Sequence, residues 1–224
     1  MKWNPEILNK LLAPGISEFT LAEIPDLTQN FPQAPHWVSN HFLNNVLRGH
    51  FRDGLRQVVV AYIRRAQNAF LAYSDARQLT LEYLDGNQPD NPRINGYFSS
   101  VTAWENFALQ ISMVIDLFRW LNQGAGAFEK NDGSKEQRLY EIANLIKHTA
   151  SAVDSGQCPG SGTIPLWLEN DGLHSFETSI TFQEVSEILA DVCKLANDYQ
   201  DPRSLKEKWA MEPQVDEDVV KQGS

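Results

Sequence analysis

Polar side chains recur at helical spacing between residues 141 and 151. Steps of three, four and three residues separate Glu141, Asn144, His148 and Ser151, and Lys147 lies at the edge of this row. That spacing places side chains on one face of a helix. An imidazole exchanges protons near neutral pH, a lysine can stabilise developing negative charge, and an amide can orient a substrate. The row predicts a catalytic site made of Asn144, Lys147 and His148; the alternative is an ordinary solvated helix face.

A single helix over residues 134–153 is expected to carry this row. Ser134 and Gln137 have the spacing of a capping box, and Gly133 ends the preceding loop. Apolar residues recur on the other side of the predicted helix, at Leu139, Ile142, Ile146 and Val153. They share one face, which we expect to pack on the core.

The segment from about residue 101 to residue 199 resembles the HEPN superfamily of small helical proteins. The resemblance rests on two antiparallel helices, the second containing Asn144, Lys147 and His148, and on the stretch 164–182 before a last helix. Catalytic members of that family are metal-independent ribonucleases of bacterial defence and toxin–antitoxin systems, and they act as dimers. The resemblance therefore implies a homodimer that binds or cleaves RNA without a cofactor.

The motif of this chain departs from the family pattern at one position. Asn144 and His148 match the polar residue and the histidine, but Ala143 stands where an arginine is expected. Arg138 lies ten positions before His148, about 15 Å along a helix and about 80° around it, too far to share a site. Lys147 is a point charge without the guanidinium fork. The alternative function is thus a non-catalytic interaction or dimerisation module, which binds a second copy of the chain or a protein partner. A third possible function is a regulatory domain that binds a small molecule, but no sequence feature favours it.

A second candidate surface is basic. Residues 41–65 hold five arginines and one acid, Asp53, within a chain whose net charge is −10. The arginines are Arg48, Arg52, Arg56, Arg64 and Arg65. The first three are four residues apart and are expected to form a ridge that binds RNA phosphates. The alternative is that these guanidinium groups pair with acids elsewhere in the fold.

Composition bounds the class of protein. The 224 residues, 42% of them hydrophobic, suffice for one domain with a sizeable core. The charge of −10 disfavours non-specific nucleic-acid binding. Two cysteines without a CxxC pair suggest neither a disulfide framework nor a zinc site, and they favour a cytoplasmic protein. No signal peptide or membrane span is expected, and no metal, nucleotide, DNA-binding or serine-hydrolase motif is present.

The predicted fold is mainly α: an antiparallel bundle of four to five long helices with one small β-hairpin. We expect one helical domain over residues 1–200, with a proline-rich arm (1–35) packed on it and a partly disordered tail (201–224). The predicted parts of the domain are helices within 37–84 that break near Gly49 and Gly54, a core helix at 97–123, a hairpin at 164–168 and 173–180, and a last helix from Thr181 to about Tyr199 that begins with a capping box.

Overall fold

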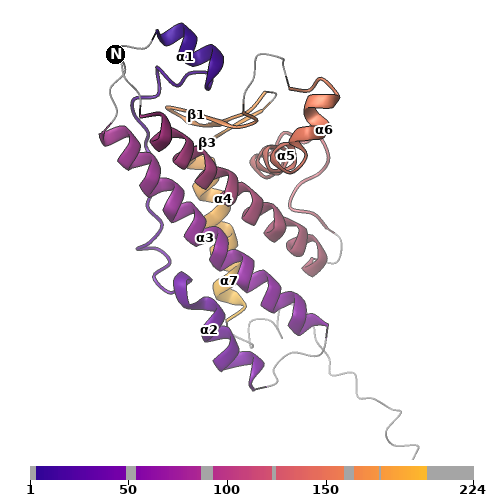
Figure 1. Cartoon of the computed structure of the whole chain (residues 1–224). Coiled ribbons are helices and arrows are strands. Elements are labelled where there is room, and N and C mark those ends of the chain that lie inside the picture. Colours follow the sequence, from indigo (N-terminus) through magenta and orange to yellow (C-terminus); the bar gives the residue numbers. More distant parts are fainter. Residues whose placement is uncertain are drawn as a thin grey trace, which may run out of the picture.

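The computed structural model describes residues 4–48, 54–86, 93–122, 125–158, 164–176 and 178–200. Within them the protein is mainly helical, with a small antiparallel sheet (Figure 1). The elements in chain order are α1 (Pro5–Leu11), the 3₁₀ turn η1 (Ala34–His36), α2 (Trp37–His41), the π-helical turn η2 (Phe42–Val46), α3 (Leu55–Asp85), α4 (Ile94–Leu121), α5 (Lys135–Lys147), α6 (Thr149–Asp154), β1 (Trp167–Glu169), β2 (Gly172–His174), β3 (Ser179–Thr181) and α7 (Phe182–Asp198).

The two longest helices, α3 and α4, run antiparallel and form the centre of the molecule (Figure 1). One face of α3 is buried, at Val59, Tyr62, Ala66, Phe70 and Tyr73. Trp104 and Phe107 of α4 are completely buried in the same core. The ring of Tyr73 meets both of these aromatic rings edge-on, with centroids 5.6 Å apart. The indole of Trp104 donates to Thr80 Oγ1 at 2.9 Å, so the one polar atom of this buried side chain is satisfied.

Helix α7 packs along this pair and begins as the sequence predicts. The Thr181 hydroxyl accepts from the Glu184 N–H, and the Glu184 carboxylate accepts from the Thr181 N–H, which completes the capping box. Val185, Leu189 and Cys193 are completely buried on one face of α7. The capping-box spacing therefore predicted where this helix begins.

The β segment contains one more strand than the predicted hairpin. β1 pairs with β2 through the Asp171–Gly172 turn, but residues 173–180 do not form a single strand. They divide into β2 and β3, which pair antiparallel with Leu173 opposite Ile180. Gly172 allows this close pairing, because a Cβ at that position would collide with the carbonyl oxygen of Ile180.

The N-terminal arm packs on the domain through buried side chains and fixed hydrogen bonds. Ile16 and Phe19 are buried, and Phe19 stacks on Tyr83 of α3 with ring centroids 5.8 Å apart. Tyr73 Oη donates to the carbonyl oxygen of Pro25 at 2.8 Å, and Arg77 Nε donates to that of Ile24 at 3.0 Å. These bonds tie an extended segment to α3. The predicted tail, residues 201–224, lies outside the described residues.

The helix predicted over residues 134–153 is interrupted. α5 ends at Lys147 and α6 begins at Thr149, with His148 between them. Val153, predicted to face the core, is 57% exposed, because the break changes the direction of the chain after the buried Leu139 and Ile142. In Figure 1, α5 is seen nearly along its axis while α4 lies across the view, so α5 crosses α4 and is not its antiparallel partner.

Candidate functional site

His148 occupies the break between α5 and α6. Its backbone, at φ −117° and ψ 28°, is outside the helical range, yet its N–H donates to the carbonyl oxygen of Asn144 at 3.0 Å and its own carbonyl accepts from Ala152 at 2.9 Å. The Thr149 hydroxyl lies 3.1 and 3.0 Å from the carbonyl oxygens of Leu145 and Ile146. Such a side-chain bond competes with the helical backbone ladder. The break thus places an exposed imidazole at a corner of the chain.

An open cavity of about 570 Å³ lies beside this corner, which we name the His148 groove. One wall comes from α5 and α6, and the other comes from the turn between β2 and β3. Its lining residues are Glu141, Asn144, Leu145, His148, Ser151, Ala152, Ser155, Gln157, Ser175, Phe176 and Thr178. Asn144 and His148 are therefore brought together as predicted, and the polar row continues across the helix break into Ser151 and Ser155.

The groove is polar and carries no cation among its lining residues. Its donors and acceptors are hydroxyls, two amides, one imidazole and the carboxylate of Glu141. The β2–β3 wall is shaped by Ser175, whose N–H and hydroxyl both donate to the carbonyl oxygen of Thr178, at 2.9 and 3.1 Å. Groups of this kind form hydrogen bonds to sugars and base edges and do not neutralise phosphate charge.

Lys147, the third predicted catalytic residue, does not line this groove. Its ammonium lies 5.7 Å from the centroid of the Tyr140 ring, a cation–π distance. Tyr140 lines a neighbouring cavity of about 580 Å³, together with Arg119, Lys130 and Asn144. Asn144 therefore lies between the two hollows on either side of α5.

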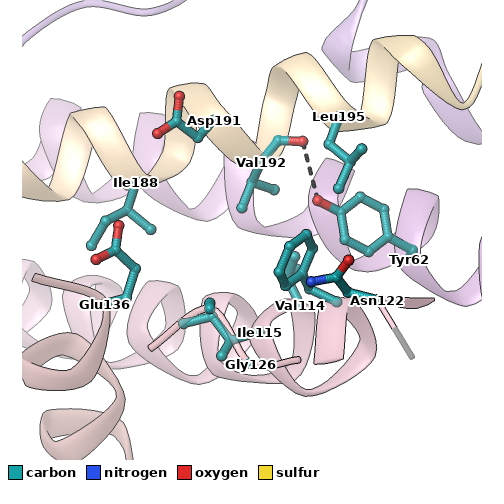
Figure 2. A pocket seen from close by; sticks show the side chains of 12 residues that line it. Tyr62, Val114, Ile115, Asn122, Gly126, Glu136, Ile188, Asp191, Val192 and Leu195 are labelled. Atoms are coloured by element: carbon teal, nitrogen blue, oxygen red, sulfur yellow. Dashed lines mark hydrogen bonds between the residues drawn. The ribbon is translucent and has the colours of Figure 1, made fainter. Parts of the chain in front are cut away.

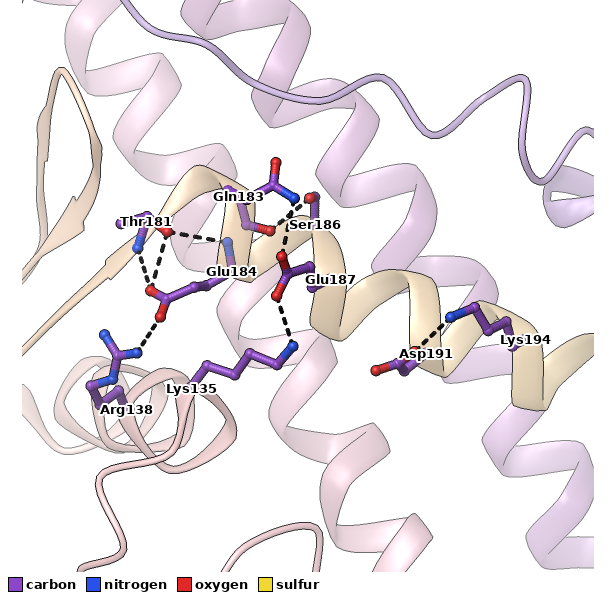
Figure 3. A network of polar contacts seen from close by, with 9 residues as sticks. All are labelled: Lys135, Arg138, Thr181, Gln183, Glu184, Ser186, Glu187, Asp191 and Lys194. Atoms are coloured by element: carbon purple, nitrogen blue, oxygen red, sulfur yellow. Dashed lines mark hydrogen bonds and ion pairs between the residues drawn. The ribbon is translucent and has the colours of Figure 1, made fainter.

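The Arg138 side chain connects three elements of the fold through hydrogen bonds. One terminal nitrogen donates to Glu184 Oε1 at 2.6 Å (Figure 3). The other donates to the carbonyl oxygen of Ser179 at 2.7 Å. Partial burial acts to raise the pKa of Glu184, but the bonds from Arg138 and Thr181 outweigh it and lower that pKa. The guanidinium thus joins α5, β3 and α7, and the expectation that Arg138 does not share a site with His148 agrees with this geometry.

The predicted arginine ridge is not one helical row. Arg48 follows η2, Arg56 lies in the first turn of α3, and Arg52 falls outside the described residues. Further along α3, Arg64 is exposed and Arg65 donates to Gln110 of α4 at 3.1 Å. In Figure 1 the first turns of α3 lie far from α5 and α6. The structure therefore does not bring the four described arginines, Arg48, Arg56, Arg64 and Arg65, to the His148 groove.

One group among the described residues has the donor atoms of a metal site: Glu169, Asp171 and His174, whose ligating atoms lie within 4.8 Å of one another. His174 Nε2 lies 2.8 Å from Asp171 Oδ1, and Nδ1 lies 3.7 Å from Glu169 Oε1. Trp167 Nε1 also donates to Glu169 at 2.9 Å. These side chains satisfy one another's hydrogen-bonding groups at the surface of the β1–β2 turn.

Sequence reasoning missed the second wall of the groove, Ser175, Phe176 and Thr178. They lie some thirty residues from His148 in the chain, and only the fold brings them opposite α6. The sole local signal was a short polar interval between apolar strand residues.

None of the helices in the described part of the chain combines the length and apolar character needed to cross a membrane. Comparison of the chain with models of protein families, with curated proteins and with solved structures found no match.

Proposed function

We propose that the chain is a HEPN-like RNA-binding protein and that the His148 groove is where it binds or cleaves RNA. One observation carries the proposal: His148 and Asn144 line the same open polar groove, at a helix break that exposes the imidazole. The groove offers hydroxyls and amides for ribose and base edges. A homodimer, and a role in bacterial defence or a toxin–antitoxin pair, follow from the resemblance to that family. A cytoplasmic location follows from the cysteine content. All three are part of the proposal.

In a catalytic form, His148 transfers one proton. As a base it takes the proton of the ribose 2′-hydroxyl, whose oxygen attacks phosphorus; as an acid it protonates the leaving 5′-oxygen. One imidazole cannot perform both transfers in a single step, so a second copy of the chain would supply the other. Asn144 positions the scissile group, and the flexible stem of Lys147 lets its ammonium leave Tyr140 and approach the phosphate.

A second function, a non-catalytic interaction module, is favoured by the charge of the groove. Its lining contains Glu141 and no lysine or arginine, and Arg138 is held by Ser179 and Glu184. A phosphoryl transition state needs nearby positive charge. In this interpretation the same surface binds a protein partner or a second copy, and His148 contributes contact area.

The experiment that tests the proposal is cleavage of a labelled, mixed RNA pool by the purified protein and by His148→Ala, each with and without a chelator. The proposal predicts RNA cleavage by the wild type that the chelator does not affect and that falls at least about 100-fold in the variant, the scale of a lost general acid or base. Because His148 is exposed, the melting temperature of the variant should stay within about 3 °C of the wild type.

His36→Ala is the matched control, since His36 is also exposed but lies on η1, outside the groove. It should leave both cleavage and melting unchanged. If the folded wild type cleaves no RNA and His148→Ala weakens self-association, the chain is better described as the non-catalytic interaction module.

A further inference from the structure

A third cavity, more apolar than the two described above, lies where α4 ends and α7 passes; we name it the Glu136 cavity. Its volume is about 300 Å³. Its body is formed by Val114, Ile115 and Phe118 of α4 and by Ile188, Val192 and Leu195 of α7, with the Tyr62 ring of α3 at one end. Figure 2 shows these side chains converging from three helices on one space. Apolar walls of this kind favour a hydrophobic ligand.

Two carboxylates line the cavity at the end away from Tyr62, those of Glu136 and Asp191 (Figure 2). Asp191 forms an exposed ion pair with Lys194, Nζ to Oδ1 at 2.9 Å. Glu136 is half-buried and has no hydrogen-bond or ion-pair partner among the residues that the structure describes. The first turn of α5 and the charge of Lys135 stabilise this carboxylate only at a distance, and its oxygens accept no hydrogen bond from the described residues, so the group can accept a cationic ligand.

The lysine that neighbours Glu136 is already paired with another carboxylate. Lys135, next to Glu136, donates to Glu187 Oε2 at 2.9 Å (Figure 3). That bond is the main cause that raises the pKa of Lys135, and the charges of Glu187, Glu136 and Asp191 add to it. No lysine or arginine is among the lining residues. The electrostatic field at this end of the cavity is therefore negative.

We propose that the Glu136 cavity binds a small hydrophobic amine, with its ammonium between Glu136 and Asp191 and its apolar part against Phe118, Val192 and Tyr62. A water molecule occupies about 30 Å³ in the liquid, so the cavity of about 300 Å³ has room for a small molecule of about ten non-hydrogen atoms. The cavity shares no lining residue with the His148 groove. Amine binding is thus a regulatory or ligand-binding function independent of the proposed RNA site.

The test is isothermal titration of the full chain at low salt with three compounds of similar size: 2-phenylethylamine, 2-phenylethanol and 3-phenylpropionate. The amine should bind at least about ten times more tightly than the neutral alcohol, because both fill the apolar part but only one carries the charge. The carboxylate should bind more weakly than the alcohol.

Two variants separate the contribution of the Glu136 charge from that of the apolar walls. Glu136→Gln keeps the shape of the side chain and should abolish the tenfold preference for the amine while leaving alcohol binding unchanged. Val192→Phe fills the cavity and should weaken both compounds. The control Glu23→Gln removes the same charge at an exposed position outside the cavity and should bind like the wild type. Thermal melting of each variant verifies that it is folded.

Equal binding of the amine and the alcohol, an unchanged preference in Glu136→Gln, or no binding of any compound to the folded wild type would each overturn the proposal. In the last case, binding of a lysine-containing peptide at this cavity would assign it to a protein partner. RNA cleavage is measured in its own assay. His148→Ala should still bind the amine, because His148 does not line the Glu136 cavity.

Discussion

Two histidines of this protein illustrate how placement decides what an imidazole can do. His148 is exposed at a helix break and lines an open groove. His41 is 1% exposed between α2 and η2, where its Nδ1 lies 3.1 Å from Asn45 Nδ2, and Asn45 in turn donates to the carbonyl oxygen of Gln200 at 3.1 Å. The first can meet a substrate, whereas the second can only influence stability.

The stability of the protein should depend on pH through His41. Burial lowers the pKa of His41 below its ordinary value of 6.5, and a hydrogen bond with the Tyr199 backbone opposes this only in part. At pH 7.5 the side chain is neutral in both the folded and unfolded states. As the pH falls through 6.5, the unfolded chain takes up a proton first, so the free energy of unfolding decreases.

Urea unfolding at pH 7.5, 6.5 and 5.5 checks this expectation against His41→Gln, which cannot titrate and retains an acceptor for Asn45. The wild type should lose more stability than the variant over this range. The carboxyls with lowered pKa, such as Asp26 and Glu184, lose their contribution only at more acidic pH. Parallel decreases in the two proteins would contradict the assignment to His41.

At the scale of the element, the junction of α5, β3 and α7 depends on Arg138. Arg138→Met removes the bonds to Ser179 and Glu184 and should lower the free energy of unfolding by about 1–2 kcal/mol, since charge-assisted hydrogen bonds that are partly exposed contribute in this range. RNA cleavage per folded molecule should not change, because the guanidinium lies outside the His148 groove.

Lys135→Met provides the control in the same helix. It breaks a single ion pair with the exposed carboxylate of Glu187 and should lower the free energy of unfolding much less than Arg138→Met does, because exposed ion pairs are screened by solvent. Chemical denaturation measures both variants. An Arg138→Met protein of wild-type stability but without RNA activity would place Arg138 in the site and contradict the assignment made here.

The elements with local signals were predictable. Ser134 accepts from the Gln137 N–H and Thr181 forms a full capping box with Glu184, so the starts of α5 and α7 follow from residue types three positions apart. The break at His148 was not predictable, since no glycine or proline marks it. At the break the Thr149 hydroxyl donates to the carbonyl oxygens of Leu145 and Ile146, and residue type alone does not predict this contact, because the same hydroxyl can point to solvent from an unbroken helix.

Contacts between distant segments were the other part that the sequence did not reveal. The composition of the β segment predicted the β1–β2 turn, but the third strand and the far wall of the groove require Ser175 and Thr178 to pack opposite α6. Likewise, Arg138 pairs with Glu184 from 46 positions away. Spacing within one element cannot report such pairings, and so Asn144 and His148 were predicted to be neighbours while their surroundings were not.

At the scale of the whole molecule, charge limits how RNA can bind. The chain carries a net charge of −10, and the His148 groove has no lysine or arginine among its lining residues. Binding in the groove should therefore neutralise at most about two phosphates, which gives a slope of log K against log salt no steeper than about −1.4 for single strands. Fluorescence anisotropy of a short labelled RNA between 50 and 200 mM salt measures this slope.

A steep slope, near −3 or beyond, would instead indicate that several arginines along the start of α3 neutralise the phosphates. Arg64→Gln separates the two cases, because Arg64 is exposed and outside the groove. It should leave a groove-bound RNA unaffected.

The most direct test of the central claim is to locate the bound RNA. A short RNA containing 4-thiouridine is cross-linked to the folded protein by light, and the attached peptides are identified by mass spectrometry. The proposal predicts cross-links in the stretch 141–157 and at Ser175, Phe176 or Thr178, since the residues that line the two walls of the His148 groove lie there. Cross-links confined to α3, or none at all, would contradict it.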